Sequence, residues 1–329
     1  MPSGARGART EVPDAWSEDL LGPGWSARTI ELEPGEPATL VRRDVARRPV
    51  RGAVLYVHGF SDYFFQAHLG HVFASRGYRF YALDLPRHGR SLRPGQLANH
   101  TEDLQEYFPV LDAAAEIVRE AGDGPLVLLG HSTGGLTASL WANARRDAGG
   151  PDALILNSPW FDFNAPWFDR VVLSRVVKAL GPLAPRLTVR RLSPYYTRFL
   201  HRDSGGEWDF DLAWKPFDGF PARAGFLRAV RIGHDAVKAG LDIACPVLMC
   251  CSTSSGSSNS FHSRLDRTDC VLDVAHMMAR APGLGRDVTI RPIDGGIHDL
   301  ALSPHLARSR YFDAMLEWLE ERLRPQDDG

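Results

Sequence analysis

The amino-acid sequence predicts an α/β protein with a doubly wound, mostly parallel sheet, and three observations lead to this prediction. Continuously apolar runs such as 53–57 and 126–129 have the length of strands buried on both faces of a sheet. Segments with helical spacing separate these runs, which is typical of βαβ units. The alternation breaks between about residues 160 and 223 and then resumes. We therefore expect one core, 27–159 with 236–329, interrupted by an insertion after the sixth strand.

The elements are expected in the following order. Residues 1–26 are rich in Gly, Pro and charge, and are predicted to be a loosely ordered lead-in. Strands are predicted at 28–32, 38–42, 53–57, 79–83, 126–129, 153–157, 246–250 and 288–293. Helices are predicted at 66–76, 101–120, 135–145 and 271–281. A final amphipathic helix follows, in which Phe312, Met315, Leu316, Leu319 and Leu323 keep the spacing of one buried face.

Local signals support several of these boundaries. Pro34 and Gly35 form the turn between the first two strands. Thr101 and Asp103 supply capping and first-turn chemistry for the helix that follows them. Pro109, inside that helix, marks a kink or a break because proline removes a backbone donor.

Composition narrows the function classes. Of 329 residues, 44% are hydrophobic and 24% are charged, as in ordinary globular proteins. The formal net charge of -2 provides no basic surplus for a nucleic-acid partner. No apolar stretch approaches the roughly 18 residues of a membrane span, and no secretory signal is recognised. The four cysteines do not form a disulfide framework or a zinc motif, so a cytoplasmic protein without metal or cofactor is expected.

The strongest functional signal is the run from Gly130 to Gly134, a G-x-S-x-G motif centred on Ser132. It lies between a predicted buried strand and a predicted helix, the context of a nucleophile elbow. A sharp turn there strains the serine and demands neighbours almost without side chains. The following helix N-terminus offers amide donors and a positive dipole end to an oxyanion. Ser132 is therefore the expected nucleophile.

A serine hydroxyl needs a base, and the expected chain order is Ser, then acid, then His. Of twelve histidines, His298 has both this order and a place in the loop after the last strand. His305 falls at the start of the closing helix, where a surface or capping role is more typical. His262 and His276 precede the last strand and are weaker candidates.

The acid should follow strand 246–250. Asp269 lies in the loop just before the predicted helix 271–281 and is favoured, with Asp266 as the next candidate. Asp273 would lie one turn inside that helix, where a solvated role is expected. Asp287 and Asp294 flank the last strand and come too late.

The second oxyanion donor should come from the loop after the third strand, where His58, Gly59 and Phe60 follow one another. The backbone amides of Phe60 and Thr133 would form the pair. His58 is expected to shape this loop by hydrogen bonding, not to transfer protons.

Together these segments resemble the α/β-hydrolase superfamily, in particular its monoacylglycerol lipase, lysophospholipase and serine aminopeptidase-like group. The matching segments are 58–60, 84–91, the Ser132 elbow, 269–273 and 295–298. The resemblance implies a structural turn at 84–91. It also implies that the insertion is a helical cap (160–235) over the active site, which provides an apolar tunnel for an acyl chain. One departure is the Ser-rich stretch within 252–268, because the family usually passes from strand to acid within a few residues.

The predicted function is a cofactor-free serine hydrolase that cleaves a lipophilic acyl ester such as a monoacylglycerol or a lysophospholipid. The same triad could instead serve a peptidase, thioesterase, acyltransferase or carbon–carbon hydrolase, and a non-catalytic binding module is a further alternative. Haloalkane dehalogenase and epoxide hydrolase chemistry is disfavoured because its nucleophile at this elbow is an aspartate. A monomer or homodimer is expected, with transient contact to membrane surfaces.

Aromatic residues cluster in the predicted cap. Residues 160–226 hold 14 of the 32 aromatic residues, about twice the average density of the chain. Some of them must pack the cap itself, and others are expected to line an acyl site. The residues expected to contact substrate are Phe60, His131, Trp160 and Phe161.

Overall fold

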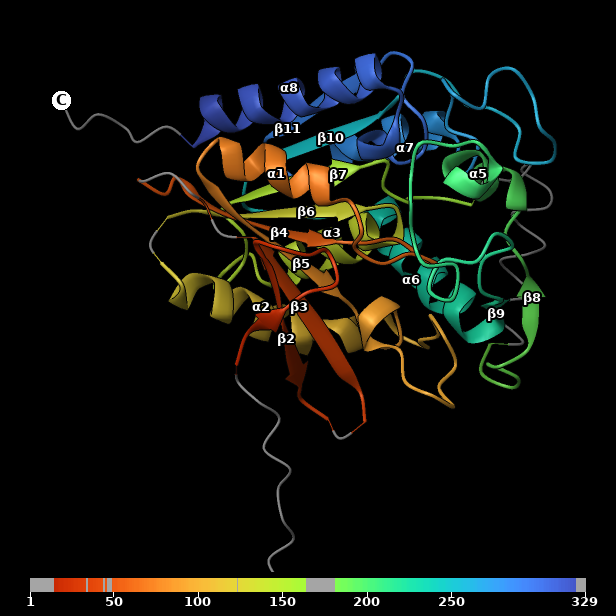
Figure 1. Ribbon diagram of the computed structural model, residues 1–329, viewed down its shortest axis with the longest axis horizontal. Coiled ribbons are helices and arrows are strands. Elements are labelled where there is room, and N and C mark those ends of the chain that lie inside the picture. The colour runs from red at the N-terminus through yellow and green to blue at the C-terminus, as the bar shows by residue number, and fades with distance from the viewer. Residues whose placement is uncertain are drawn as a thin grey trace, which may run out of the picture.

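The computed structural model describes residues 15–33, 35–43, 45, 49–122, 124–163 and 181–323. Within these residues, one nine-stranded sheet forms the centre of the molecule (Figure 1). Its strands lie in the spatial order β1 (Ser17–Glu18), β2 (Trp25–Glu31), β3 (Pro37–Arg43), β5 (Tyr78–Asp84), β4 (Gly52–Val57), β6 (Leu126–His131), β7 (Ala153–Asn157), β10 (Val247–Ser252) and β11 (Val288–Ile293).

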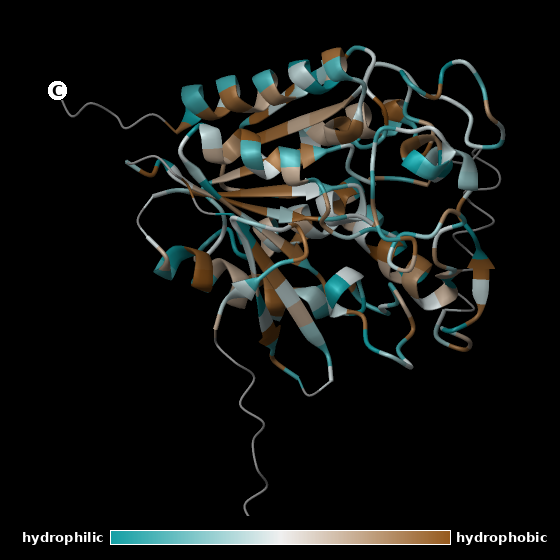
Figure 2. Ribbon diagram, in the orientation of Figure 1, coloured by the Kyte–Doolittle hydropathy of each residue, from teal (hydrophilic) through white to brown (hydrophobic). Residues whose placement is uncertain are grey.

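The predicted, mostly parallel sheet is confirmed. Strands β5, β4, β6, β7, β10 and β11 pair in parallel, and the pairs β1–β2, β2–β3 and β3–β5 are antiparallel. The central strands are largely brown in Figure 2, because most of their residues are hydrophobic. Since parallel strands end at the same edge of a sheet, the loops after β4, β6, β10 and β11 meet there.

Helices cover both faces of the sheet (Figure 1). Helices α1 (Ala67–Ser75) and α8 (His305–Arg322) pack on one face with the core cluster around Phe73, Tyr311 and Trp318. On the other face, α2 (Phe108–Glu120), α3 (Thr133–Ala144) and α6 (Ala224–Ala239) share a second cluster that includes Trp141. This double cover explains why the central strands carry no polar face.

Part of the predicted lead-in joins the sheet. Ser17 and Glu18 pair with Ala27 and Ser26 as a short edge strand. Behind them, Asp19 is bound by the Arg90 guanidinium, with its Oδ2 2.7 Å from Nε. Two-residue edge strands leave no period in the sequence, which is why this one was not predicted.

The predicted helix 101–120 is divided. A 3-10 helix (Leu104–Tyr107) comes first, and the Asp103 side chain caps it by accepting from the Gln105 amide at 2.9 Å. Helix α2 then begins, with Pro109 in its first turn. Proline is tolerated there because that amide would have no partner within the helix.

Residues 181–235 of the predicted cap contain β8 (Thr188–Arg190), α5 (Pro194–Leu200), β9 (Ala222–Arg223) and the start of α6. Strands β8 and β9 form a separate antiparallel pair. A third apolar cluster joins this part to the core: Tyr196, Leu200 and Phe210 pack with Tyr63 and Ile297 from the loops after β4 and β11. The cap boundaries stay a prediction, and Trp167 and Phe168 lie outside the described residues.

None of the helices in the described ranges is both long enough and apolar enough to cross a membrane.

Candidate active site

Ser132 lies at the turn between β6 and α3 with strained backbone geometry. Its φ is 53° and its ψ is -118°, in the positive-φ region that side chains rarely adopt. It also serves as the N-cap of α3, so the helix N-terminus lies directly beside its hydroxyl. The strand–turn–helix context predicted for the G-x-S-x-G motif is confirmed.

The glycines of the motif are required by close backbone approach. A Cβ at Gly134 would lie 2.2 Å from the carbonyl oxygen of His58, and one at Gly130 would lie 2.7 Å from that of Gly134. Both neighbours are backbone atoms and could not move aside without shifting β4 or the elbow. The strained serine is thus held between strand, helix and the loop after β4.

His298 contacts both other members of the predicted triad. It lies in the loop after β11, with Nε2 3.1 Å from Ser132 Oγ and Nδ1 2.9 Å from Asp269 Oδ2. All three side chains are buried or nearly so. The structure therefore brings together the expected nucleophile, the expected base and the favoured acid.

Asp269 is fixed from several sides. Its Oδ1 accepts the amides of Val271 at 2.8 Å and Leu272 at 2.7 Å, which leaves Oδ2 for His298. Its own amide donates to the Ser254 carbonyl, and its carbonyl accepts from Gly256, at 2.9 and 2.8 Å. The Ser-rich stretch therefore returns the chain to the strand end, which reconciles the long 252–268 loop with the usual place of the acid.

The competing acids lie elsewhere. Asp266 is half-buried and pairs with Arg267 at 2.8 Å. Asp273 was expected one turn inside a helix, and this expectation is wrong. It is the N-cap of α7 (Val274–Arg280), and its side chain accepts from the Ala275 amide. The helix begins later than predicted because the Asp269 carboxylate holds the preceding amides.

The competing histidines also bond elsewhere. His305 is the exposed first residue of α8, as expected. His262 contacts the Ser257 carbonyl at 2.9 Å, and His276 lies 3.8 Å from the Asp273 carboxylate.

The loop after β4 lies against the elbow. A Cβ at Gly59 would be 3.0 Å from Ser132 Cβ. His58 Nδ1 lies 2.8 Å from the Gly59 carbonyl, and its Nε2 accepts the Leu85 amide at 3.1 Å. Because one nitrogen donates and the other accepts, His58 is a neutral ring that shapes the loop. Phe60 follows directly, and Thr133 is the first residue of α3, whose amide has no acceptor within the helix.

The predicted substrate contacts differ in their placement. Phe60 stacks on Phe226 at 4.4 Å between ring centroids, and Trp160 lies 6.3 Å from the same ring. Phe161 is 1% exposed within the core cluster, so packing explains its position. His131 is buried, and its Nδ1 lies 3.1 Å from the Asn157 carbonyl.

Beside the triad lies a buried polar cluster that the sequence analysis did not identify. Asp299 accepts hydrogen bonds from Asn157 at 2.8 Å and from Gln66 at 3.0 Å. Burial alone would raise the pKa of Asp299, but the His131 ring and these two amides lower it below its ordinary value. Two features of the sequence could have indicated this cluster. Asp299 directly follows His298, and Asp62, which also belongs to the cluster, is close to the predicted oxyanion loop.

The donor atoms of Asp62, His131 and Asp299 lie within 4.8 Å of one another, close enough to hold a metal ion. The Lys215 ammonium, however, already lies 2.6 Å from Asp62 Oδ1 and supplies a positive charge. The donor set therefore fits a buried ion pair better than a metal site.

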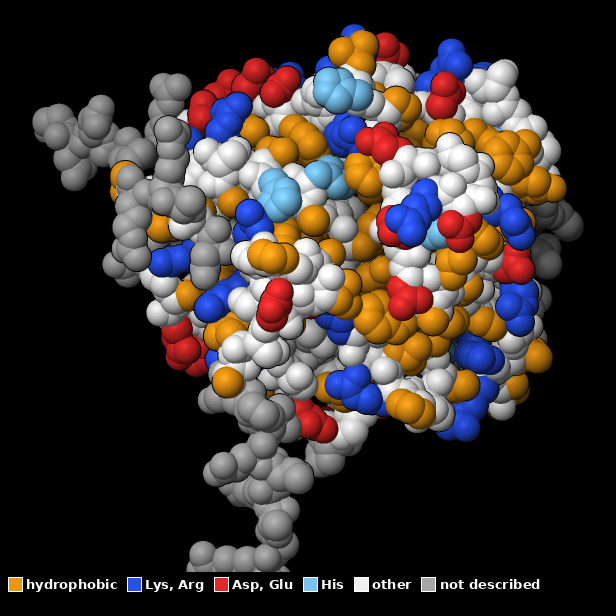
Figure 3. Space-filling view, in the orientation of Figure 1, with side chains coloured by type: hydrophobic (Ala, Val, Ile, Leu, Met, Phe, Trp, Pro, Cys, Tyr) orange, Lys and Arg blue, Asp and Glu red, His pale blue; other side chains and the backbone are white. Residues whose placement is uncertain are grey.

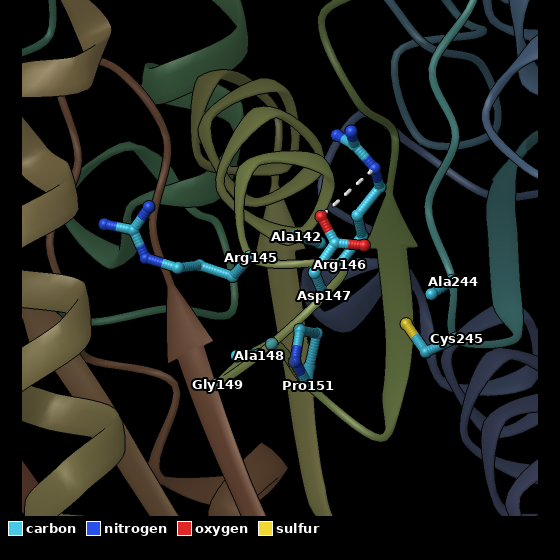
Figure 4. A pocket seen from close by; sticks show the side chains of 10 residues that line it. Ala142, Arg145, Arg146, Asp147, Ala148, Gly149, Pro151, Ala244 and Cys245 are labelled. Carbon is cyan, nitrogen blue, oxygen red and sulfur yellow. Dashed lines mark ion pairs between the residues drawn. The ribbon is translucent and has the colours of Figure 1, made fainter.

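One cavity among the described residues has a volume of about 180 Å³ (Figure 4). It is lined by Ala142 of α3, by residues 145–151 between α3 and β7, and by residues 244–245, which precede β10. It therefore lies at the opposite edge of the sheet from Ser132, which follows β6. Figure 4 shows that its side chains are short or charged, including Arg146 paired with Asp147 at 3.9 Å.

Three buried histidines predict a loss of stability in acid. Burial lowers the pKa of His88 and His131, and lowers that of His234 to about 3. Below about pH 6.5 the unfolded chain binds protons that these folded rings reject, so each ring lowers the stability by at most about 1.4 kcal/mol per pH unit. We expect the Tm to fall steeply between about pH 7 and pH 5.

Calorimetry of the His234→Gln variant tests this, because the amide keeps a donor for the Trp160 carbonyl but does not titrate. Its pH slope should be shallower, whereas exposed His305→Gln should keep the original slope. Equal slopes for all three proteins would contradict the assignment.

Comparison with known proteins decides the family. A family model described as serine aminopeptidase, S33 (Hydrolase_4) matches residues 48–213, which is half of the chain. The chain belongs to this family. The match includes the Ser132 elbow and the loop after β4, and it places the S33 chain in the α/β-hydrolase superfamily, as its resemblance implied.

Two curated relatives were found for this S33 family member. The chain is 35% identical over 146 residues to a monoacylglycerol lipase of Mycolicibacterium smegmatis, covering 43% of the chain and 49% of the relative. It is 33% identical over 145 residues to phospholipase YtpA of Bacillus subtilis, covering 44% and 53%. The aligned region thus spans about half the length of these relatives.

Solved structures agree on the fold. A monoacylglycerol lipase of Paleococcus ferrophilus superposes with a TM-score of 0.64 at 23% identity, covering 86% of this chain and 98% of that one. A monoglyceride lipase of Saccharomyces cerevisiae superposes with a TM-score of 0.70 at 17% identity, covering 96% and 100%. The α/β-hydrolase fold predicted from the sequence is confirmed.

Proposed function

We propose that this protein is a serine hydrolase that cleaves lipophilic carboxylic esters through an acyl-enzyme. The observation that carries this proposal is the continuous hydrogen-bonded line from Ser132 through His298 to Asp269. Such a line activates a hydroxyl that is otherwise a poor nucleophile. No metal or redox group is required for this chemistry.

In the proposed reaction, Ser132 Oγ attacks the ester carbonyl while His298 Nε2 takes its proton. Asp269 holds the Nδ1 proton and stabilises the imidazolium that results. The Phe60 and Thr133 amides donate to the oxyanion of the tetrahedral intermediate. His298 then gives its proton to the leaving alcohol, and the acyl group stays on Ser132. Water, deprotonated by His298, releases the acid and restores the serine.

The substrate class is proposed from two supporting observations. The two curated relatives are named a monoacylglycerol lipase and a phospholipase. Aromatic rings from Phe60, Trp160 and Phe226 pack together close to the elbow. These features favour a long-chain monoacylglycerol or a lysophospholipid.

Transient docking at a lipid surface fits this substrate class. Leu183, Leu187 and Phe261 are 82%, 50% and 56% exposed. Hydrophobic side chains also gather on the face shown in Figure 3, over the region of α5 and α6. A substrate that resides in lipid would be reached from this side.

The test is turnover of p-nitrophenyl esters of increasing chain length, from acetyl to palmitoyl, followed by monoacylglycerol and lysophospholipid substrates. We expect kcat/KM to rise with acyl length until the site is filled, because each buried methylene contributes about 0.8 kcal/mol. A flat zero across all esters, with correctly folded protein, would refute the proposal.

Peptide hydrolysis is the second candidate, since the family model is described as a serine aminopeptidase. An aminopeptidase must bind an α-ammonium group, usually with a carboxylate. The buried carboxylates beside the triad are engaged, Asp62 by Lys215 and Asp299 by Asn157 and Gln66. Comparing aminoacyl p-nitroanilides with esters at matched concentration distinguishes the two, and we expect the esters to dominate.

A further inference from the structure

We propose that Lys215 is a positioning residue for the oxyanion loop, so that the 211–220 segment sets the place of the Phe60 amide. The inference rests on the proposed function, because it assigns the Phe60 amide to the oxyanion. It concerns three consecutive residues, Ser61, Asp62 and Tyr63, which follow Phe60 and are called here the 61–63 loop.

Each residue of the 61–63 loop is bonded to the 211–220 segment. Ser61 Oγ accepts the Phe220 amide at 3.0 Å, and Tyr63 OH accepts the Asp211 amide at 2.8 Å. Between them, Lys215 Nζ donates to Asp62 Oδ1 at 2.6 Å. These three bonds to one short segment fix both the position and the orientation of the 61–63 loop.

The central bond is a buried ion pair. Asp62 is 2% exposed and Lys215 is 9% exposed. The Lys215 ammonium also lies 5.5 Å from the Phe65 ring centroid and 5.6 Å from that of Phe210, so its remaining surroundings are largely aromatic. Removing either partner leaves a buried charge without compensation, and the loop would shift to bring water to it.

The backbone of the loop depends on such external restraint. Ser61 has a φ of 53°, in the left-handed region that a serine rarely adopts. A conformation of this kind persists only when the surroundings over-determine it. Its neighbour Phe60 carries the amide in question, and Gly59 on the other side lies so close to the elbow that an added Cβ would be 3.0 Å from Ser132 Cβ. Releasing the 61–63 loop therefore moves the donor and leaves the nucleophile in place.

Oxyanion donors act only within a narrow range of distances, and losing one of them lowers kcat by about 10²-fold or more. A displaced Phe60 amide would stabilise the transition state less, while ground-state binding of the ester would change little. This difference distinguishes a positioning role from a general loss of folding. A partly misfolded protein has fewer active molecules, but its active molecules keep the same affinity for the ester relative to an inhibitor that forms the oxyanion.

The test compares Lys215→Met, Asp62→Asn and the double variant with the wild type. We expect kcat to fall by about 10- to 100-fold with KM changed less than about threefold, and the double variant to be no worse than the poorer single one. Inhibition by a trifluoromethyl ketone, which forms the oxyanion, should weaken by the same factor as kcat/KM. The control is Arg231→Met, which breaks another ion pair of the predicted cap, with Asp162 at 3.4 Å, and should keep full activity.

Hydrogen–deuterium exchange over residues 58–66 supplies a readout that does not depend on turnover. Exchange should accelerate there in Lys215→Met and remain unchanged in Arg231→Met. Wild-type kcat and exchange in Lys215→Met would overturn the inference, even if the ester hydrolase activity is real. If no ester is turned over, the proposed function fails, and exchange still decides whether Lys215 holds the loop. Should Lys215→Met not fold, Tyr63→Phe removes the acceptor for the Asp211 amide and tests the same loop.

Discussion

Replacing Ser132 with alanine is expected to lower kcat for ester hydrolysis by about 10⁴-fold or more. The hydroxyl is the only group on the hydrogen-bonded line that can form the acyl bond, so the rest of the triad cannot compensate. Stability should change little, because alanine keeps the same Cβ at a φ of 53° and removes only one oxygen. The measurements are steady-state turnover, labelling by a fluorophosphonate, and the Tm.

A matched control lies on the same helix. Ser139 is buried in α3 and donates to the Gly135 carbonyl at 2.8 Å, away from His298. Ser139→Ala should keep both labelling and turnover. Labelling that persists in Ser132→Ala would exclude Ser132 as the nucleophile.

Asparagine at position 269 is expected to lower kcat by about 10⁴-fold, an effect known for triads whose acid becomes an amide. The local geometry gives the reason. The amides of Val271 and Leu272 both donate to Oδ1, so the asparagine oxygen must stay on that side. Its NH₂ group then faces His298 Nδ1 and forces that nitrogen to accept. The ring proton moves to Nε2, which can no longer take the proton of Ser132.

Asp266→Asn is the matched comparison, because Asp266 was the alternative acid and lies three residues away. It is half-buried and pairs only with its neighbour Arg267 among the described residues, so its substitution should leave kcat unchanged. The pH profile adds a second check: Asp269→Asn should recover part of its rate in alkaline solution, as hydroxide replaces the missing base. Equal losses in the two variants would remove Asp269 from the proposed triad.

Strands and helices with strong local patterns were predicted well. Strands β7 (Ala153–Asn157) and β11 (Val288–Ile293) match the predicted ranges. Ser132 and His298 could be selected because each lies at a boundary that chain order and element type define. Asp269 required a choice between neighbours, and the bonds that distinguish it come from the folded 254–256 segment.

The features that were missed depend on distant contacts. Lys215 and Asp62 are separated by 153 positions, and nothing near either residue indicates the other. One trace was visible in the composition: Lys215 is one of only three lysines in the chain. Asp299 was overlooked for a similar reason, since its partners Gln66 and Asn157 come from other loops and strands.

Because Ser255 and Asp269 form a bridge, the position of the acid does not depend on the number of residues between them. Once these two segments are paired, the stretch between them is a closed loop whose ends are fixed. The conformational entropy lost on closing such a loop grows only with the logarithm of its length, by about 0.6 kcal/mol per doubling. Insertions or deletions at its exposed tip would therefore change the free energy of unfolding only slightly. The carboxylate would still meet His298, because its place is set by the sheet and not by counting along the chain.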